Sequence, residues 1–471
     1  MKWQRPTQEE LNRMTSEQKD QLIMQLFDAL EALTARVAEL EKQVTKTSRN
    51  SSKPPSSDGL RKGPAQPRQK GKRSSGGQKG HKGSTRQIVD QPDRVEVLHP
   101  QGTCLCGGAL EALPARVKER RQQIEIPMPR RVVTEYRQMQ VTCRCGRRHA
   151  GTFPAGVTPN VSHGPRLKAY AVGLNQGHFV ALERTCQILR DQYGVAPSVG
   201  TLQHWIQEMA TALTPAYEAA GEQIRRADVA HFDESGLRVR GRLHWLHVAA
   251  TTEAVHYTVH ARRGHEAMEA AGILPHFQGI AVHDHWSPYW RYTKCQHVLC
   301  NAHHLRELNY SEALTGYDWP RQLRETLISA QQAVDQARAQ GKTRLPQDQI
   351  ATFLHAYDRH LHQGLKAHPV KLPKPGSHRR SRQHPSTNLL MRLRDHRTAI
   401  WRFLTDWRVP FSNNHAERMV RPIKVKLKVI GSFRAMGGSQ AFCVIRSVWE
   451  TSKLQGQNPF EVLRMAGAGT E

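Results

Sequence analysis

The sequence has few acidic residues, few aromatic residues and no long apolar run. Asp and Glu number 41 against 69 Lys and Arg, which leaves a formal charge of +28, and aromatic residues make up 6% of the chain. No stretch approaches the roughly 20 apolar residues of a transmembrane helix, and the first five residues lead into no apolar signal segment. We therefore expect a cytoplasmic, nucleoid-associated protein without a membrane partner. Its excess of positive charge favours a polyanion such as double-stranded DNA.

Cysteine is also scarce, and half of it occurs in two close pairs. The chain of 471 residues holds eight cysteines, and the paired ones are Cys104, Cys106, Cys143 and Cys145. Without a secretory signal, paired cysteines indicate metal ligands before they indicate disulfides. A length of 471 residues is typical of about three domains.

Residues 1–47 are predicted to form a coiled-coil helix. From Ile23 to Val44, apolar residues recur at alternating steps of three and four, which favours a parallel homodimer. The alternative is a single amphipathic helix packed on its own domain. Residues 48–88 are rich in Ser, Pro, Gly, Lys and Arg, and they are predicted to be a disordered basic linker. The linker would either contact phosphates without sequence preference or act as a solvated tether.

Residues 89–160 are predicted to be a zinc-binding module. The stretch from Gln122 to Val141 has β-forming residues, and it separates the two Cys-x-Cys pairs. Four thiolates on two turns can hold a structural zinc ion in a small β module. One residue between the cysteines gives a tighter turn than the usual two, and four free thiols are the alternative.

Residues 161–226 are predicted to be helical. Gly194 and the segment 197–201 indicate a turn between two helices, as in a helix-turn-helix that binds DNA. The alternative is a plain packing unit, because two helices joined by such a turn are common in that role.

Two aspartates are placed at the ends of predicted strands. The expected strands span residues 228–233, 242–250, 254–261 and 279–283, and a short helix spans residues 264–272. Asp233 ends the first strand and Asp284 follows the fourth. Three strands, a helix and a parallel central strand are the order of a ribonuclease-H-like α/β domain, here residues 227–309 and 408–454. The two carboxylates would then lie side by side and hold two magnesium or manganese ions.

Each aspartate also has a structural alternative. Asp233 would be an N-cap or turn residue before Ser235 and Gly236, and Asp284 would be a turn residue before Ser287 and Pro288. Glu417 is the predicted third metal ligand, and its alternative is a capping box at a helix start. The following residues form a basic stretch suited to DNA phosphates: Arg418, Arg421, Lys424, Lys426 and Lys428.

Residues 310–407 are predicted to be a helical insertion over the site, with a basic break at residues 371–386. Just before it, a second group of residues has metal-binding side chains: Cys295, Cys300, His303 and His304. These are either a second metal site or core and hydrogen-bonding residues. Residues 455–471 are expected to be a C-terminal tail.

Several motifs in this order resemble those of transposases of the insertion sequence 66 family. They are NSSKPPSSDG from residue 50, GGQKGHKGSTR from residue 76, HFDES, HDHW, CNAHHLREL and NNHAER. The resemblance implies a ribonuclease-H-like DDE transposase in which Asp233, Asp284 and Glu417 are the DDE residues. It also implies binding of terminal inverted repeats, DNA cleavage by water and joining of the 3′-hydroxyl to target DNA, with helper proteins of the same element as further partners. The chain departs from the family at its Cys-x-Cys spacing and at Ser412, where many relatives have Asp.

Two other functions fit the same sequence. One is a non-catalytic, zinc-dependent DNA-binding regulator in which the carboxylates are structural. The other is a ribonuclease-H-like nuclease that cuts nucleic acid without joining strands.

Overall fold

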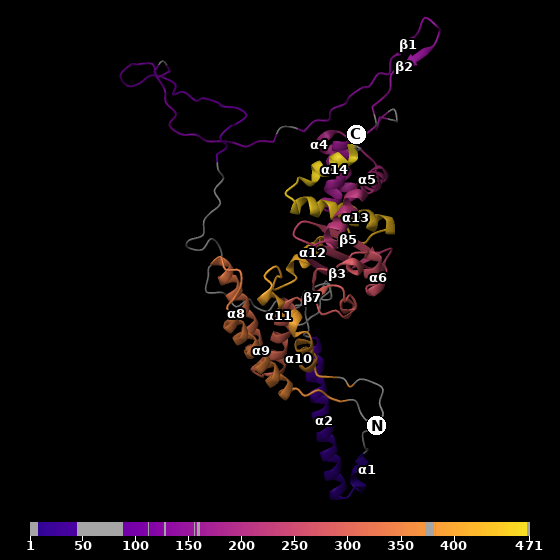
Figure 1. The fold of residues 1–471 in the computed structure, drawn as a ribbon, viewed down its shortest axis with the longest axis vertical. Helices are drawn as coiled ribbons and strands as arrows, with labels where there is room; N and C mark the ends of the chain where they lie inside the picture. Colours follow the sequence, from indigo (N-terminus) through magenta and orange to yellow (C-terminus); the bar gives the residue numbers. More distant parts are fainter. Residues whose placement is uncertain are drawn as a thin grey trace.

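The computed structural model describes residues 8–44, 88–111, 113–126, 129–154, 156–157, 161–372, 381 and 383–468. A mixed α/β body holds one five-stranded sheet with helices on both faces, and a bundle of helices lies beside it (Figure 1). An N-terminal helix and a long extended arm project from this body (Figure 1). The architecture is that of a multidomain α+β chain.

The central sheet combines antiparallel and parallel strands. It consists of β3 (Val229–Val239), β4 (Arg242–Ala250), β5 (Val255–His260), β6 (Ile280–His283) and β7 (Gln296–Leu299). The spatial order is β5-β4-β3-β6-β7, with antiparallel pairs on the β5 side of β3 and parallel pairs on the β7 side.

Strand β3 is longer than the sequence suggested. It continues past Asp233 to Val239, and it pairs with β4 from His231 onward. The expectation that the strand ends at Asp233 is wrong, and so is the alternative of a turn at Ser235 and Gly236. The reason is that the antiparallel partner β4 hydrogen-bonds to this stretch, which overrides the local turn preference of Ser and Gly.

The two faces of the sheet carry different helices. Leu237 and Val239 pack toward α12 (Asn414–Val429) and α13 (Met436–Leu454). Ala230 and Phe232 pack toward the end of α5 (Val199–Arg225) and toward α6 (His265–Ala271). Since successive strand residues point to opposite faces, Asp233 lies on the α12 face and Glu234 on the α6 face.

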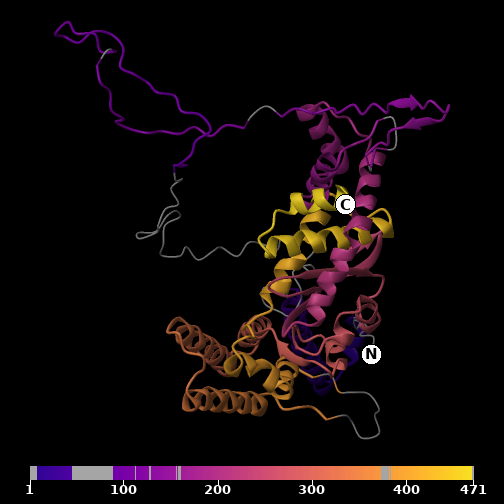
Figure 2. The ribbon, with the colours of Figure 1, turned by 45° about the horizontal axis from the view of Figure 1, so that its top comes forward.

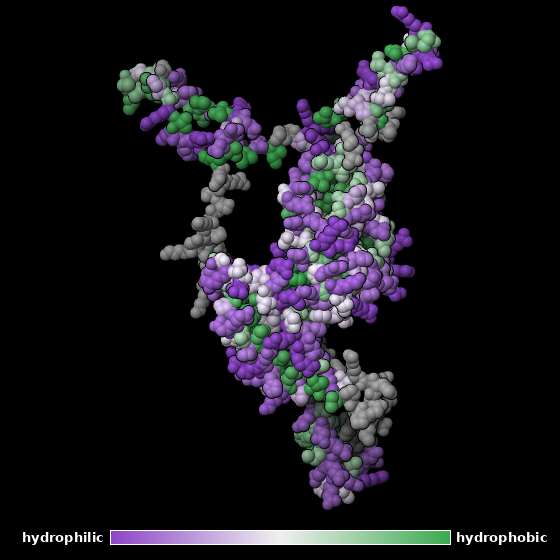
Figure 3. Space-filling model, viewed as in Figure 1, coloured by the Kyte–Doolittle hydropathy of each residue, from purple (hydrophilic) through white to green (hydrophobic). Residues whose placement is uncertain are grey.

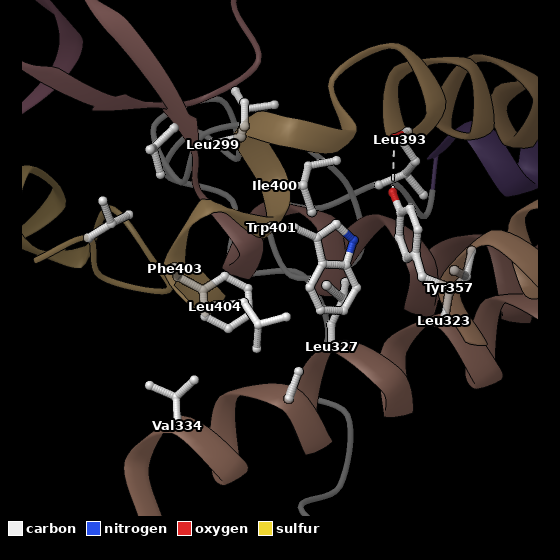
Figure 4. Packing of buried hydrophobic residues seen from close by; sticks show 14 of the residues in the cluster. Leu299, Leu323, Leu327, Val334, Tyr357, Leu393, Ile400, Trp401, Phe403 and Leu404 are labelled. Carbon is white, nitrogen blue, oxygen red and sulfur yellow. Dashed lines mark hydrogen bonds between the residues drawn. The ribbon is translucent and has the colours of Figure 1, made fainter. Parts of the chain in front are cut away.

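A bundle of helices follows β7. It comprises α7 (Asn301–Thr315), α8 (Trp319–Ala339), α9 (Gln347–Ala367), α10 (Pro385–Asp395) and α11 (Arg397–Thr405). Leu327, Tyr357 and Trp401 lie in its core, where the Tyr357 hydroxyl donates to the Leu393 carbonyl at 2.9 Å (Figure 4). Each such buried side chain stabilises the fold by about 1.5–3 kcal/mol. Within the predicted basic break, residues 373–380 and 382 lie outside the described residues.

A second helical layer lies at the other end of the body. It contains α3 (Pro165–Val172), a π-helix (Gly173–Gly177), α4 (Leu182–Tyr193), α5 and α14 (Pro459–Ala468). Gly194 ends α4 with a positive φ of 64°, and Ser198 caps α5 by accepting from the Thr201 N–H at 3.0 Å. Helix α14 lies in the segment expected to be a tail, and Figure 2 shows it beside α13 (both yellow).

The projecting parts have few internal contacts. Helix α1 (Gln8–Arg13) precedes α2 (Ser16–Val44), whose Ile23, Leu26, Leu30 and Leu33 are 49–60% exposed. In the extended arm, apolar and polar side chains alike face solvent (Figure 3), and a small hairpin joins β1 (Gln140–Thr142) to β2 (Arg148–Ala150). Of the predicted coiled coil and linker, residues 1–7 and 45–87 lie outside the described residues. Across the described chain, no helix combines the length and apolarity needed to cross a membrane.

Candidate active site

Asp233 and Asp284 are brought together by the pairing of two parallel strands. β3 and β6 are in register with His231 opposite Val282. Two residues further along each chain lie Asp233 and Asp284, the latter directly after the last residue of β6. Because side chains alternate along a strand, both aspartates share the face that α12 covers.

The two aspartates lie in a setting that disfavours their charge. Burial, followed by the charges of Glu234 and Asp284, raises the pKa of Asp233 well above its usual value. Burial also raises the pKa of Asp284. In each carboxylate, Oδ1 accepts a backbone N–H at 2.8 Å, from Glu234 and Trp286 respectively. Neither forms an ion pair with a described Lys or Arg, so the donor set fits a hard divalent cation such as Mg²⁺.

Asn413 anchors the start of α12 beside Asp233. Its side-chain amide donates to the Phe232 carbonyl at 2.8 Å, and its Oδ1 accepts from His231 Nδ1 at 2.9 Å. Its backbone N–H donates to the Cys300 sulfur at 3.1 Å. Sequence reasoning gave Asn413 no role, although the paired Asn of the NNHAER motif was the signal for one.

Glu417 lies in the first turn of α12, whose N-cap residue Asn413 makes no side-chain capping hydrogen bond. Its backbone N–H donates to the Asn413 carbonyl, but its Oε1 is buried without a hydrogen bond. His303 Nδ1 and Arg306 Nη2 each lie 3.8 Å from that oxygen. The capping-box interpretation is therefore wrong, because no described bond ties the carboxylate back to the backbone.

The three predicted carboxylates share one side of the sheet without forming a tight cluster. Glu417 contributes to the raised pKa of Asp233, so the two charges interact. Among the described residues, the one trio of metal-binding side chains whose ligand atoms all lie within 4.8 Å of one another is Cys300, His303 and Glu417.

The paired cysteines of the arm are exposed, and each pair occupies a tight turn. The Cys104 N–H donates to the Gly108 carbonyl at 2.9 Å, and the Cys143 N–H donates to the Arg147 carbonyl at 2.8 Å. Hydrogen bonds within these turns lower the pKa of Cys106 and of Cys143, which favours the thiolate. In the described arm the two turns do not converge into one group of ligand atoms.

The basic residues of α12 fall into two groups. Arg418, Arg421 and Lys428 are exposed. Lys424 is half-buried; burial lowers its pKa, and the opposite charge of Asp233 counteracts this shift. Lys426 differs from the others, because it is 6% exposed and lies 3.7 Å above the Phe433 ring. Burial lowers its pKa to about 8, so Lys426 is a core residue in this arrangement.

Glu234 is a second carboxylate that sequence reasoning did not single out. It accepts from Arg263 Nε at 3.0 Å and from the Tyr289 hydroxyl at 2.7 Å on the α6 face. The Arg263 guanidinium lies 4.0 Å above the Trp286 ring. Burial and the charge of Asp284 raise the pKa of Glu234 to about 7, and Arg263 opposes this shift. The two successive acids in HFDES were the available signal.

Comparison with known proteins separates the chain into matched and unmatched segments. Residues 3–87 match a family of unknown function (DUF6444), and residues 160–441 match the Transposase IS66 family. The cysteine arm lies between the two matches. No curated protein has a significant match to the chain. Because the second match spans more than half of the 471 residues and contains the whole sheet together with α12, the chain belongs to the IS66 family of transposases.

Proposed function

We propose that this transposase binds the terminal inverted repeats of its element and catalyses metal-dependent DNA cleavage and strand transfer with Asp233, Asp284 and Glu417. The observation that carries the proposal is the parallel register of β3 and β6, which aligns the two aspartates on one face. Asn413 then ties the helix that bears Glu417 to the strand residue before Asp233. Three carboxylates from distant parts of the chain therefore share one side of the sheet.

The topology supports a ribonuclease-H-like catalytic domain. Three antiparallel strands, β3 to β5, precede α6, and two parallel strands, β6 and β7, extend the sheet on the other side of β3. This is the strand order expected of that fold, with the first carboxylate on the central strand. The helical bundle between β7 and α12 is then an insertion, and it places Arg306 of α7 next to Glu417.

The carboxylates would hold two Mg²⁺ or Mn²⁺ ions, which supply charge to activate the attacking oxygen and to stabilise the leaving one. The residues of the chain have separate tasks. Asp233 and Asp284 offer carboxylate oxygens that form no ion pair with a Lys or Arg among the described residues. Lys424, whose charge interacts with that of Asp233, is placed to contact a phosphate that approaches the carboxylates. Cleavage by water and attack by a 3′-hydroxyl need no nucleophilic side chain.

Other parts of the chain would hold the DNA. Arg418, Arg421 and Lys428 are exposed basic residues on the helix that carries Glu417. The turn between α4 and α5 suits a helix-turn-helix, and the cysteine turns of the arm suit a zinc ion. The exposed apolar residues of α2 support a coiled-coil homodimer, which would bring two element ends together. Helper proteins of the same element remain proposed partners.

The proposal is tested with DNA that carries the ends of the element and a supercoiled target. With Mg²⁺, the unaltered protein should produce free 3′-ends and joined products, whereas Glu417→Gln should bind the same DNA and produce neither. Asp228→Asn is the matched control, because Asp228 lies just before β3 and is exposed. Cleavage without joining would identify a nuclease, and unchanged function in Glu417→Gln would identify a non-catalytic regulator.

A further inference from the structure

Cys300, His303 and Glu417 converge on one point beside the proposed catalytic carboxylates. Cys300 directly precedes α7, His303 lies in the first turn of α7, and Glu417 lies in the first turn of α12. One ligand atom from each side chain lies within 4.8 Å of the other two. Residues more than 100 positions apart therefore meet where two helices begin.

Two of the three ligand atoms at this point lack a hydrogen-bonding partner. His303 Nδ1 and Glu417 Oε1 are both buried and lack a hydrogen bond, and they lie 3.8 Å apart. Burying such a group without a partner is unfavourable. Two unpaired polar atoms beside a buried thiol are the arrangement expected of ligands that face a shared cation.

We propose that Cys300, His303 and Glu417 form a three-ligand site for a zinc-class ion. Sulfur, imidazole nitrogen and a carboxylate oxygen are ligands of Zn²⁺ or Co²⁺, whereas Mg²⁺ prefers oxygen alone. Ligand atoms around a tetrahedral zinc ion lie about 3.3–3.8 Å apart, given bond lengths of about 2.0–2.3 Å. The separation of 3.8 Å between His303 Nδ1 and Glu417 Oε1 is close to this range.

Burial raises the pKa of the Cys300 thiol to about 12, and backbone hydrogen bonds oppose this shift. The Asn413 N–H donates to the Cys300 sulfur at 3.1 Å, and a bond of this kind favours the deprotonated ligand. When the metal–sulfur bond forms, the thiol proton passes to solvent and no redox change occurs. The guanidinium of Arg306, at 3.8 Å from Glu417, competes with the ion for that carboxylate.

Of the four metal-binding residues that the sequence places close together, Cys295, Cys300, His303 and His304, only two belong to this site. Cys295 donates to the Tyr292 carbonyl at 3.1 Å, and His304 pairs with the Asn301 side chain at 2.9 Å. Both are therefore used within the core, while Cys300 and His303 point to Glu417. Sequence spacing could not pair them with a carboxylate that lies 114 residues beyond His303.

The inference goes beyond the proposed function and does not depend on it. An ion at this site would fix Glu417 Oε1 and join the starts of α7 and α12. The second carboxylate oxygen would stay available to the catalytic centre. Glu417 would then belong to two metal sites of different chemistry, one selective for zinc-class ions and one for magnesium.

The test is a Co²⁺ titration of the full chain in which Cys104, Cys106, Cys143 and Cys145 are each changed to Ser. This background removes the exposed cysteines that would also bind cobalt. The expected result is one equivalent of bound Co²⁺ with a near-ultraviolet thiolate-to-cobalt band. Adding Cys300→Ser should abolish the band, and adding His303→Ala should weaken Co²⁺ binding by at least about tenfold. Glu417→Gln should weaken binding but keep the band.

Two controls separate this site from its neighbours. Cys295→Ser alters another buried cysteine close by in the chain, and it should keep the band. Asp233→Ala with Asp284→Ala removes two of the three proposed catalytic carboxylates and should also keep the band, even though cleavage is lost. Circular dichroism confirms folding, and His303→Ala decides the question if Cys300→Ser does not fold. A band that is absent in the background protein, or that survives in Cys300→Ser, overturns the proposal and leaves the catalytic proposal untouched.

Discussion

Asp233 and Glu234 are neighbours on β3, but the two faces of the sheet treat their charges differently. On the α6 face, Glu234 has Arg263 and Tyr289 as partners, and its side chain is 1% exposed. On the α12 face, Asp233 accepts one backbone N–H and lies near Asp284 and Glu417. One face gives its buried carboxylate an ion pair, whereas on the other face neither Asp233 nor Asp284 forms an ion pair with a described Lys or Arg.

The difference shows that an acidic residue becomes available for metal binding when the fold leaves it unpaired. Burial alone does not distinguish the two residues, because it raises the pKa of both. What distinguishes them is the side-chain partner, because the ion pair of Glu234 with Arg263 uses the oxygens that a metal ion would need. The following predictions test this contrast between the two faces.

The largest expected difference is in catalysis. Asp233→Asn keeps the shape of the side chain but removes the charge, so DNA cleavage with Mg²⁺ should fall by roughly 1,000-fold or more. Glu234→Gln should keep cleavage within about tenfold, because Glu234 faces the other helices. Cleavage rates of the two variants on the same DNA measure this. Equal losses would break the contrast between the faces.

For stability, replacing Glu234 should have the larger effect and replacing Asp233 the smaller one. Glu234→Ala leaves Arg263 without its buried partner and should lower the free energy of unfolding by about 3 kcal/mol, a value reduced because Arg263 is partly exposed. Asp233→Ala should be neutral or stabilising, because it removes repulsion from nearby carboxylates. Urea unfolding without divalent cations compares the two. A similar loss in both variants would contradict the prediction.

Lys426 extends the contrast to a buried cation on the α12 face. Burial depresses its pKa from 10.5 to about 8, so the stability linked to its titration is present above pH 10.5 and is lost as the pH falls through 8. Lys426→Met should therefore raise the free energy of unfolding by about 2 kcal/mol at pH 7, after loss of the cation–π contact with Phe433.

The gain from Lys426→Met should shrink as the pH rises from 8 and should vanish only above pH 10.5, where the unaltered lysine is neutral in both states. Denaturant unfolding of both proteins at several pH values gives this difference directly. Lys428→Met is the matched control, because Lys428 is exposed on the same helix and should show no comparable trend. A pH-independent gain would mean that packing, and not charge, determines the effect.

The smallest expected effect is on DNA affinity. Arg421→Ala removes an exposed charge, so DNA binding should weaken several-fold and the slope of log K against log salt should decrease by about one. Lys426→Met should leave both quantities unchanged, because Lys426 is buried. Binding titrations at several salt concentrations measure both variants. A change in salt slope for Lys426→Met would show that the lysine leaves the core when DNA binds.

Much of the sheet was predictable because its signals are local. The alternation in RLHWLHVAA and the apolar GIAVH placed β4 and β6 within a residue of their observed bounds. The end of β3 was not predictable, since Ser235 and Gly236 favour a turn until β4 pairs with them. Exposed and buried lysines of α12 also look alike in sequence, and only packing against Phe433 sets Lys426 apart.

The sequence by itself determined the family, the charge of +28 and which residue types are available for chemistry, because motif order and composition need no coordinates. Only the tertiary structure decided which of these residues meet. Strand register aligns Asp233 with Asp284, and the bonds of Asn413 carry Glu417 and α12 to the sheet. Packing of α7 beside α12 then brings Cys300 and His303 to the same carboxylate. Such contacts join residues up to about 180 positions apart, a distance over which local sequence patterns carry no geometric information.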